Sequence, residues 1–345
     1  MENSPKILIC KPSSLGDIIH ALPVLRHIKR AWPQAQVYWW VNVGLAPILE
    51  EDPDLTGVIH FDRRAWGRLR QLPRNLEQIR RIRRMKFDYV LDLQALLRSA
   101  LFSWLLRPGR LIGLDARREA APLFYHQAFS RPHPNTHAVD WYLEVLKALK
   151  IEPSADFEWI APKPLAAQSL QARLKITADT APMKTLLLQP CTRWQSKQWP
   201  LEHFISCVKE ILERREDIQV YLLGSREDKA TGEAIIRVSG RKRVRNLCGS
   251  LSLPEMVECI RLGDLMLTAD TGPMHVAAAL KKPLVALFGA TNPYRTGPYE
   301  QLDSVLMAGL PCSPCLRKRC PLTPSPKCMY DLAPGRVVEA ILAKI

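Results

Sequence analysis

A short segment near the N-terminus carries residue types that could bind a ligand and supply a carboxylate for chemistry. It runs from Lys11 to His20 (KPSSLGDIIH) and follows an apolar run directly. Ser13 and Ser14 offer hydroxyls and amides, and Gly16 lets a ligand approach the backbone closely. Asp17 would stand at the N-terminal end of a helix, where the helix dipole favours a carboxylate. Asp17 could therefore serve chemistry, or it could cap an ordinary strand-to-helix turn.

A second segment, residues 269–279 (ADTGPMHVAAA), has the pattern of a helix start after a strand. Asp270 or Thr271 can cap such a helix, and Pro273 suits its first turn. The free backbone amides at a helix N-terminus bind phosphate. His275 lies one turn further on, at the same end. The segment predicts either a phosphate-binding helix start or a well-capped packing helix.

A third segment, residues 189–200 (QPCTRWQSKQWP), also lies between a strand-like run and a helical stretch. Thr192 and Lys197 could bind a phosphate, whereas Trp194 and Trp199 are equally consistent with packing. Two shorter loops, Gly224-Ser225 and residues 289–293, follow further strand-like runs.

The elements that must position these segments alternate along the chain between short apolar runs and stretches with helical spacing. This alternation is typical of βαβ units and a parallel sheet, in which ligands bind at the carboxyl ends of the strands. The segment from Ile151 to Pro182 is rich in Pro and Ala and indicates a domain boundary. Strands are predicted at 6–10, 37–41, 57–61, 89–93, 110–114, 185–189, 219–223, 265–268 and 284–288. Helices are predicted at 17–31, 201–214, 229–239, 254–262, 273–280 and 335–344.

Several common catalytic patterns are missing from the sequence. None of the 16 glycines forms G-x-G, and G-x-x-x-x-G-K-[ST], G-x-S-x-G and H-E-x-x-H do not occur. These absences argue against a dehydrogenase, a P-loop ATPase, a serine hydrolase and a zincin of the usual kinds.

The charge balance favours an anionic partner. The 345 residues include 49 Lys and Arg against 34 Asp and Glu, a formal net charge of +15. Ten of the basic residues fall between 61 and 86. Such an excess suits nucleic acid, an acidic membrane surface or a phosphorylated substrate. No RNA-binding aromatic signature or zinc-finger spacing accompanies it, so nucleic acid is the weaker alternative. No segment reaches the roughly 18 uncharged residues of a membrane span, and without a secretion-like start we expect a cytoplasmic location.

Four of the nine cysteines stand close together near the C-terminus. Cys312, Cys315, Cys320 and Cys328 have the spacing C-x2-C-x4-C-x7-C. That spacing can hold a structural Zn or Fe in a small thiolate site. The alternative is a set of free or redox-variable thiols, since stable disulfides are disfavoured in the cytoplasm. Either way, the cluster lies outside the segments proposed for catalysis.

Taken together, these segments resemble the ADP-heptose:lipopolysaccharide heptosyltransferases of glycosyltransferase family 9. The matching motifs occur in order through both halves of the chain. The N-terminal half resembles type I enzymes and the four-cysteine tail resembles type II. The motifs are K-P-S-S-L-G-D-I-I-H-A-L-P from Lys11, V-L-D-L-Q-A-L-L-R-S-A from Val90, W-x-x-K-x-W-P from Trp194, A-D-T-G-P-M-H-x-A-A-A from Ala269, F-G-A-T-N-P from Phe288 and C-M-Y-D-L-A-P from Cys328.

The resemblance implies an α/β GT-B fold, with two Rossmann-like domains whose parallel sheets face a central cleft. Residues 1–160 would bind the acceptor and residues 161–330 the nucleotide sugar. Residues 331–345 would form a C-terminal helix, for which a return to the N-terminal domain is one option. The implied reaction is an inverting, metal-independent transfer of L-glycero-D-manno-heptose from ADP-heptose. The acceptor would be Kdo-lipid A or its heptosylated inner core, and no cofactor would be required for catalysis.

The resemblance also implies roles for individual residues. Asp17 resembles the general base, and Lys197 would assist catalysis by contacting the ADP phosphates. The chain departs from the type I pattern at Pro273 and by about one additional residue before Lys197. The other implied donor contacts are Thr192, Gly224, Ser225, Asp270, Thr271, Gly272, Pro273 and His275. The implied acceptor contacts are Ser13, Ser14, Gly16, Arg63, Arg64, Gln94, Arg98, Arg117 and Arg118.

The same resemblance offers a reason for the basic charge. An inner-core acceptor carries phosphates and carboxylates and sits in an anionic leaflet, so a basic face would attach the enzyme peripherally to the inner face of the inner membrane. Two alternatives stay open. One is a related family 9 enzyme that uses another nucleotide sugar or a protein acceptor. The other is a non-enzymatic module that binds membranes or nucleic acid through its charge.

Overall fold

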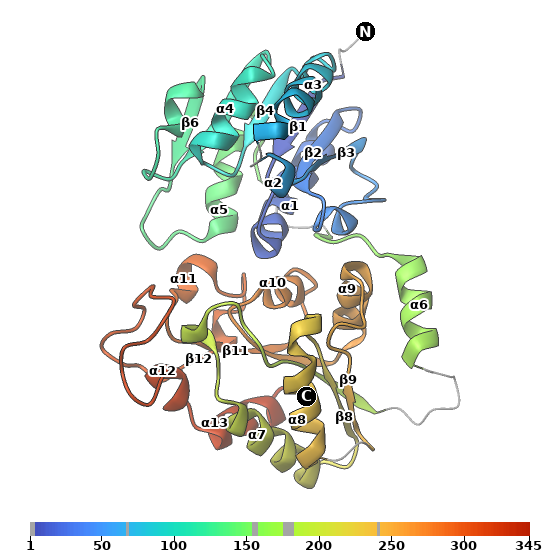
Figure 1. Ribbon diagram of the computed structural model, residues 1–345, viewed down its shortest axis with the longest axis vertical. Coiled ribbons are helices and arrows are strands. Elements are labelled where there is room, and N and C mark those ends of the chain that lie inside the picture. The colour runs from blue at the N-terminus through green and yellow to red at the C-terminus, as the bar shows by residue number, and fades with distance from the viewer. Residues whose placement is uncertain (1–3, 67–68, 154–157, 175–182, 240–241) are drawn as a thin grey trace. The chain divides into compact units, whose positions relative to one another are not determined.

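The computed structural model describes residues 4–66, 69–153, 158–174, 183–239 and 242–345 (Figure 1). The chain divides into two compact units, residues 1–161 and 162–345. The division falls inside the Pro- and Ala-rich segment from Ile151 to Pro182, of which residues 154–157 and 175–182 lie outside the described part. Each unit is built on one parallel sheet with helices.

Unit 1 contains a six-stranded parallel sheet in the order β3-β2-β1-β4-β5-β6. The first strand lies in the middle, where Ile7 pairs with Val37 on one side and Tyr89 on the other. Residues 7–10 of this strand are apolar and buried, as expected where helices cover both faces of a sheet. The strands are β1 Lys6–Cys10, β2 Gln36–Asn42, β3 Gly57–Phe61, β4 Tyr89–Asp92, β5 Arg110–Asp115 and β6 Gln127–Ser130. The α-helices are α1 Leu15–Ala31, α2 Arg63–Trp66, α3 Leu72–Arg83, α4 Leu97–Leu105 and α5 Ala138–Leu143; the 3-10 helices are η1 Ala46–Ile48, η2 Leu69–Gln71, η3 Ala121–Phe124 and η4 Glu144–Leu149.

Unit 2 repeats the plan with the strand order β12-β11-β10-β7-β8-β9. The strands are β7 Lys184–Gln189, β8 Ile218–Leu222, β9 Val244–Asn246, β10 Leu265–Ala269, β11 Leu284–Phe288 and β12 Val305–Met307. The α-helices are α6 Pro164–Leu174, α7 Leu201–Arg214, α8 Lys229–Ser239, α9 Leu253–Leu262, α10 Gly272–Ala279, α11 Pro293–Thr296, α12 Lys327–Tyr330 and α13 Pro334–Leu342; the 3-10 helices are η5 Gln195–Lys197, η6 Arg226–Asp228 and η7 Leu302–Ser304.

The predicted α/β class with two parallel sheets is confirmed. The predicted bounds of β1, β3, β11, α7 and α8 agree with the structure residue for residue. Three strands were not predicted, namely β6, β9 and β12. Each is an edge strand of three or four residues that is only partly buried. Such strands lack the continuous apolar run that marks a strand covered on both faces.

The final helix stays in unit 2. Val337, Val338 and Ile341 of α13 are fully buried in the core formed by β7, β8, β10 and α7. Arg214 of α7 pairs with Glu339 of α13 at 2.5 Å. The apolar face of this helix is therefore covered by α7 within unit 2. Among the described residues, none of the helices combines the length and the apolar character needed to cross a bilayer.

Candidate active site

Both sheets have a point at which the winding of the chain reverses. In unit 1 the chain leaves β1 toward β2 and β3, then returns to add β4, β5 and β6 on the other side. In unit 2 it leaves β7 toward β8 and β9, then adds β10, β11 and β12 on the other side. Ligands bind outside the carboxyl ends of the strands at such points. The three sequence segments singled out above follow β1, β7 and β10, so all three lie at reversal points.

Asp17 lies in the first turn of α1, immediately beyond β1. Its Oδ2 accepts hydrogen bonds from the Ser14 backbone N–H at 2.9 Å and the Ser14 hydroxyl at 2.6 Å. Its Oδ1 accepts one from the Tyr142 hydroxyl at 3.0 Å and lies 3.7 Å from Lys11 Nζ. The carboxylate therefore caps the helix, yet its side chain is still 39% exposed. The capping and chemical interpretations of Asp17 are compatible, because the hydrogen bonds fix a carboxylate that solvent and substrate can reach.

The surroundings of Asp17 keep it ionised. Desolvation by the surrounding protein raises its pKa, but the charge of Lys11 and the hydrogen bonds from Ser14 and Tyr142 lower it by more, so the pKa lies below its ordinary value. Lys11 is buried, and this desolvation lowers the pKa of its ammonium. The charges of Asp17 and Asp92 raise that pKa, but by less. Lys11 is held by a 2.9 Å hydrogen bond to the Leu93 carbonyl and lies 4.7 Å from the Tyr142 ring centre.

In unit 2, Asp270 joins two other predicted residues. Its Oδ2 lies 2.6 Å from Lys197 Nζ, and its Oδ1 lies 3.8 Å from His275 Nε2. Asp270 and His275 are both buried. Lys197 comes from η5 after β7, whereas the other two flank the start of α10 after β10. The structure thus brings the loops after β7 and β10 together at one edge of the sheet.

The start of α10 is suited to an anion. Thr271 is the N-cap residue, and its side chain makes no capping hydrogen bond to the helix. Its hydroxyl instead lies 3.1 Å from that of Thr268. Pro273 occupies the first turn, where it has no N–H to leave unpaired. The remaining N-terminal amides and the helix dipole favour negative charge at this position.

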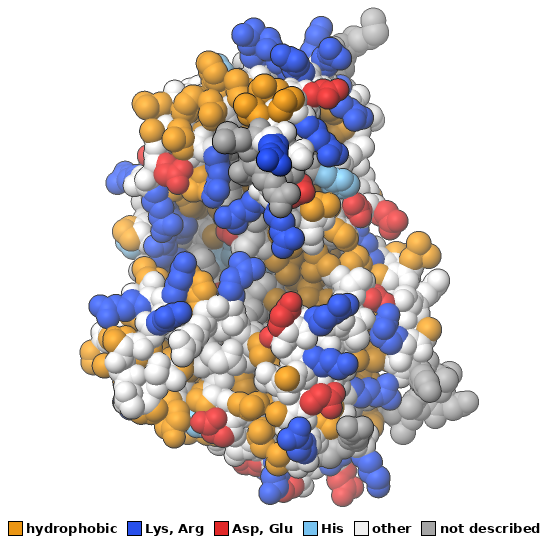
Figure 2. All heavy atoms as spheres, viewed as in Figure 1, with side chains coloured by type: hydrophobic (Ala, Val, Ile, Leu, Met, Phe, Trp, Pro, Cys, Tyr) orange, Lys and Arg blue, Asp and Glu red, His pale blue; other side chains and the backbone are white. Residues whose placement is uncertain are grey.

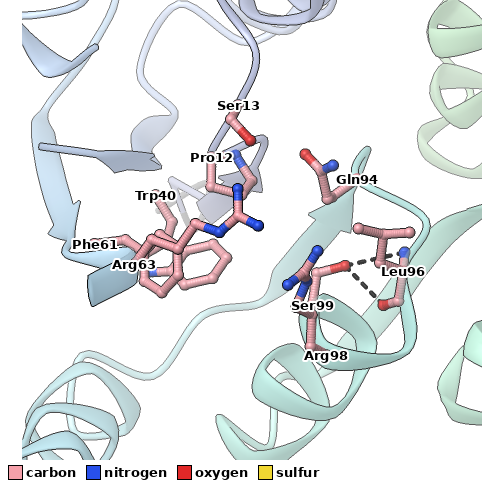
Figure 3. A pocket seen from close by; sticks show the side chains of 9 residues that line it. All are labelled: Pro12, Ser13, Trp40, Phe61, Arg63, Gln94, Leu96, Arg98 and Ser99. Carbon is pink, nitrogen blue, oxygen red and sulfur yellow. Dashed lines mark hydrogen bonds between the residues drawn. The ribbon is translucent and has the colours of Figure 1, made fainter. Parts of the chain in front are cut away.

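A pocket in unit 1 lies at the carboxyl ends of its central strands (Figure 3). The guanidinium groups of Arg63 and Arg98, the Gln94 amide and the Ser13 hydroxyl surround one space from different sides (Figure 3). Asp92 fixes Gln94, because Asp92 Oδ1 accepts the Gln94 N–H at 2.9 Å. The lining residues are Pro12, Ser13, Trp40, Phe61, Arg63, Gln94, Leu96, Arg98 and Ser99.

Two lining residues bring buried polar atoms without partners. Among the described residues, Trp40 Nε1 and Gln94 Oε1 are buried and make no hydrogen bond. Trp40 is only 3% exposed, with its ring stacked 4.1 Å from that of Phe102. One atom is a donor and the other an acceptor, and a buried group of either kind is costly to leave unpaired. The two arginines that line the pocket suit a carboxylate or phosphate.

Comparison with known proteins decides the family. Residues 76–325 match the model described as glycosyltransferase family 9 (heptosyltransferase). The chain belongs to glycosyltransferase family 9. It is 29% identical to lipopolysaccharide heptosyltransferase 1 of Pseudomonas aeruginosa, over 99% of this chain and 98% of that protein. It is 27% identical to lipooligosaccharide heptosyltransferase 2 of Campylobacter jejuni, over 97% and 98% respectively. This glycosyltransferase is therefore similar to both types that the motifs suggested.

Solved structures agree on the fold. The E. coli ADP-heptose lipopolysaccharide heptosyltransferase II superposes with a TM-score of 0.78, at 21% identity and 98% coverage of both chains. An E. coli heptosyltransferase solved with ADP superposes with a TM-score of 0.76, at 23% identity, covering 99% of this chain and all of that one. The predicted GT-B fold class of the glycosyltransferase is confirmed.

Other predicted acceptor residues lie outside the pocket. Arg64, Arg117 and Arg118 are exposed and do not line it. The Arg64 backbone N–H donates to Asp62 Oδ1 at 2.8 Å. Ser14 and Gly16 are also outside the lining, although Ser14 contacts Asp17 directly. The structure thus gathers Ser13, Arg63, Gln94 and Arg98 and leaves the other three arginines on the surface.

Three predicted donor residues are engaged within their own loops. The Thr192 hydroxyl donates to the Trp194 carbonyl at 2.7 Å. The Ser225 hydroxyl donates to Asp228 at 2.9 Å. Gly224 is needed for close packing, since a Cβ there would lie 2.9 Å from both Asp228 Cβ and Cys248 Sγ. These three residues therefore stabilise the loops after β7 and β8.

The four cysteines predicted as possible metal ligands lie near one another at the C-terminal end of unit 2. Within the described ranges, no group of three or more His, Cys, Asp or Glu side chains stands where it could hold a metal ion. Burial and the nearby thiols of Cys320, Cys315 and Cys312 raise the pKa of Cys328 to about 11. Cys312, Cys315, Cys320 and Cys328 form no disulfide, and the metal site and the free thiols both stay predictions.

The sequence analysis missed residues whose contacts or surroundings become visible only in the folded chain. Tyr142 is far from Asp17 in sequence, and no motif in its surroundings marks it. Trp40 and Phe61 lie on strands, where aromatic side chains ordinarily indicate packing. Lys11 was quoted within a motif, but only its burial beside Asp17 shows its electrostatic role. A buried polar atom without a partner becomes recognisable only once the fold is known.

Proposed function

We propose that this enzyme transfers L-glycero-D-manno-heptose from ADP-heptose to the Kdo or heptose inner core of lipopolysaccharide, with inversion at the anomeric carbon. The observation that carries the proposal is Asp17, an accessible carboxylate held ionised at the reversal point of unit 1. The names of the relatives, lipopolysaccharide heptosyltransferases 1 and 2, support the acceptor class. The relative solved with ADP supports an adenine nucleotide donor.

In this proposal Asp17 acts as the general base. It accepts the proton of the acceptor hydroxyl while that oxygen forms a bond to the anomeric carbon and the bond to ADP breaks. Attack on the face opposite to the leaving group inverts the anomeric configuration. A carboxylate with a lowered pKa is a weak base, so the proton moves late, when the attacking oxygen has become acidic. Tyr142 and Ser14 keep the carboxylate oriented throughout.

Departure of ADP develops negative charge on the diphosphate. Lys197 and the amides at the start of α10 are placed to stabilise this charge, and they do so without rearranging. Asp270 holds Lys197 in position, and His275 packs at the same edge. Because the chain itself supplies positive charge here, we propose that the transfer needs no metal ion.

The pocket of unit 1 suits an acidic sugar. Arg63 and Arg98 can pair with a carboxylate, since guanidinium groups bind carboxylates through paired hydrogen bonds. The Ser13 hydroxyl and the Gln94 side chain line the same pocket and can bind sugar hydroxyls. Kdo carries both groups, which supports Kdo as the sugar recognised here. Ser13 connects the pocket to Asp17 through its neighbour Ser14.

An apolar surface of unit 1 supports attachment to a membrane on its cytoplasmic face. Leu97, Leu101 and Trp104 share one face of α4 and are between 41% and 52% exposed. Leu123 of the adjacent η3 is 85% exposed. Figure 2 shows apolar side chains gathered where Figure 1 places α4, with basic side chains beside them. Exposed apolar residues flanked by arginines fit an anionic bilayer surface.

The test is transfer from ADP-heptose to purified Kdo2-lipid A and to its mono-heptosylated form, in the presence of a chelator. We expect product on one acceptor, and the acceptor used identifies whether the enzyme adds the first or the second heptose. Asp17→Asn should slow formation of this product about 10²- to 10⁴-fold, while Asp303→Asn, a change at an exposed carboxylate of unit 2, should not. Product from another nucleotide sugar or on a protein acceptor, with none from ADP-heptose, would identify a different family 9 activity. Loss of all activity on adding the chelator would contradict metal independence.

A further inference from the structure

A long loop between β12 and α12 brings additional positive charge to the edge of unit 2 where Lys197 lies. Residues 308–326, here called the cysteine loop, are all described and contain neither helix nor strand. Within it, Arg317, Lys318 and Arg319 are consecutive and exposed. The proposed reaction gives this loop no role.

Hydrogen bonds fasten the cysteine loop to two loops at the carboxyl edge of the sheet. The Leu316 N–H donates to the Ala290 carbonyl, just beyond β11, at 2.7 Å. The Ser196 hydroxyl donates to the Arg317 carbonyl at 2.6 Å, and the Ser196 N–H donates to the Lys318 carbonyl at 3.2 Å. Ser196 is 1% exposed and immediately precedes Lys197. The loop is therefore joined to the turn that presents Lys197.

Two ammonium groups meet at one indole ring. Lys197 Nζ lies 4.8 Å from the centre of the Trp194 ring, and Lys318 Nζ lies 5.8 Å from it. Cations are attracted to the face of an indole. Lys197 also pairs with Asp270, whereas among the described residues no carboxylate lies within 4 Å of Lys318. The Lys197–Asp270 pair carries no net charge, so Lys318 supplies the uncompensated positive charge beside Trp194.

We propose that Lys318 is a second cation for the diphosphate of the nucleotide-sugar donor. The proposal rests on the proposed function, which places the donor at this edge of unit 2. A diphosphate carries more than one negative charge, and Asp270 already offsets much of the charge of Lys197. The cysteine loop positions Lys318 to supply the net positive charge that the Lys197–Asp270 pair lacks. Ser196 is a positioning residue, because its two hydrogen bonds set the loop against η5.

The experiment measures ADP and AMP binding by calorimetry for the full-length wild type, Lys318→Gln and Lys318→Arg. Lys209→Gln, at an exposed lysine of α7, is the matched control. We expect Lys318→Gln to weaken ADP binding about fivefold to tenfold, as for a partly exposed charge pair, and AMP binding less. Lys318→Arg should retain wild-type affinity. The dependence of ADP binding on salt concentration should be shallower for Lys318→Gln, because one ionic contact is removed.

Two results would overturn the inference. One is an unchanged ADP affinity for Lys318→Gln. The other is an equal loss for Lys318→Gln and Lys318→Arg, which would show that the shape of the loop matters rather than its charge. Neither measurement needs an acceptor. Failure of this inference is therefore distinguishable from failure of the proposed function, which is tested by heptose transfer with the wild type.

Discussion

At the scale of single residues, Asp17 combines two tasks that usually conflict. A helix cap is best when its carboxylate is fully engaged, whereas a base needs a lone pair free for substrate. Ser14 occupies Oδ2 twice, while Oδ1 takes the single hydrogen bond from Tyr142. We expect Asp17→Asn to lower kcat about 10²- to 10⁴-fold, the usual contribution of a positioned base. ADP affinity should stay the same, as calorimetry can check, because the nucleotide contacts lie in unit 2. A small loss of kcat with a large loss of ADP affinity would contradict this assignment.

The ionisation of Asp17 gives a pH prediction with a definite sign. Lys11 lowers the pKa of Asp17, so replacing Lys11 by Met should raise that pKa. Activity requires the ionised carboxylate, so the acidic limb of the kcat/KM profile should move to higher pH. Tyr142→Phe removes one hydrogen bond to the carboxylate and should move the limb in the same direction without deleting a buried charge. A limb that stays in place in both variants, or moves to lower pH, would exclude Asp17 as the titrating group.

The cysteines should differ in reactivity according to burial. The thiolate is the reactive form, and burial raises the pKa of Cys328 to about 11. Cys312 is exposed. A short pulse of a thiol reagent at pH 8, followed by peptide mass spectrometry, should label Cys312 well before Cys328. Equal protection of all four tail cysteines, removed by a chelator, would instead show a thiolate-bound metal.

At the scale of elements, α9 illustrates how one cap contributes to stability. Glu255 closes a capping box with Ser252 and also accepts from Ser169 at 2.7 Å. Burial raises the pKa of Glu255, but the hydrogen bonds from Ser252 and Ser169 and the charge of Arg173 bring it down to about 2. Because the folded pKa is depressed, the stabilisation is complete above the ordinary value of 4.5 and is lost as the pH falls toward 2.

Glu255→Gln should therefore lower the free energy of unfolding at pH 7 by about 1–3 kcal/mol. The difference between variant and wild type should shrink as the pH falls from 5 to 3. Denaturant unfolding at several pH values measures both effects, with Glu213→Gln, an exposed change on α7, as the control. A difference that is constant with pH would show that the charge of Glu255 contributes nothing.

The same scale shows what the sequence could predict. Strands buried on both faces, such as β1, β7 and β10, are recognisable as apolar runs, and the loops after these three carry Asp17, Lys197 and Asp270 respectively. Loops at the same ends of neighbouring parallel strands lie close together, so the Lys197–Asp270 contact could have been predicted from the sequence. The contact of Tyr142 with Asp17 was not, because it depends on how α5 packs against α1. The unpaired Nε1 of Trp40 likewise depends on the environment of its ring.

At the scale of the whole molecule, the +15 net charge is divided among different tasks. Lys11 is buried and adjusts a carboxylate, Arg63 and Arg98 line a pocket, and Lys197 stands beside Asp270. Many of the remaining cations lie on the surface, among them the arginines of α3. A charge of this size governs solubility and long-range attraction, while specificity depends on the few cations fixed by neighbours. A purely electrostatic binding module would not need the fixed ones.

The apolar face of α4 gives the last prediction, which concerns the whole protein at a membrane. Arg80, Arg81 and Arg83 of α3 are exposed, and α3 contacts α4. Attraction to anionic lipid should bring the protein to the surface, and Trp104 should then bury its ring at the headgroup level. In vesicle sedimentation we expect binding to phosphatidylglycerol-containing vesicles that falls with salt and is weak for neutral vesicles. Trp104→Ser should reduce binding severalfold at every salt concentration, whereas Val238→Ser, at an equally exposed apolar residue of unit 2, should not. If the two variants bound alike, the attachment would be electrostatic alone and α4 would not enter the bilayer surface.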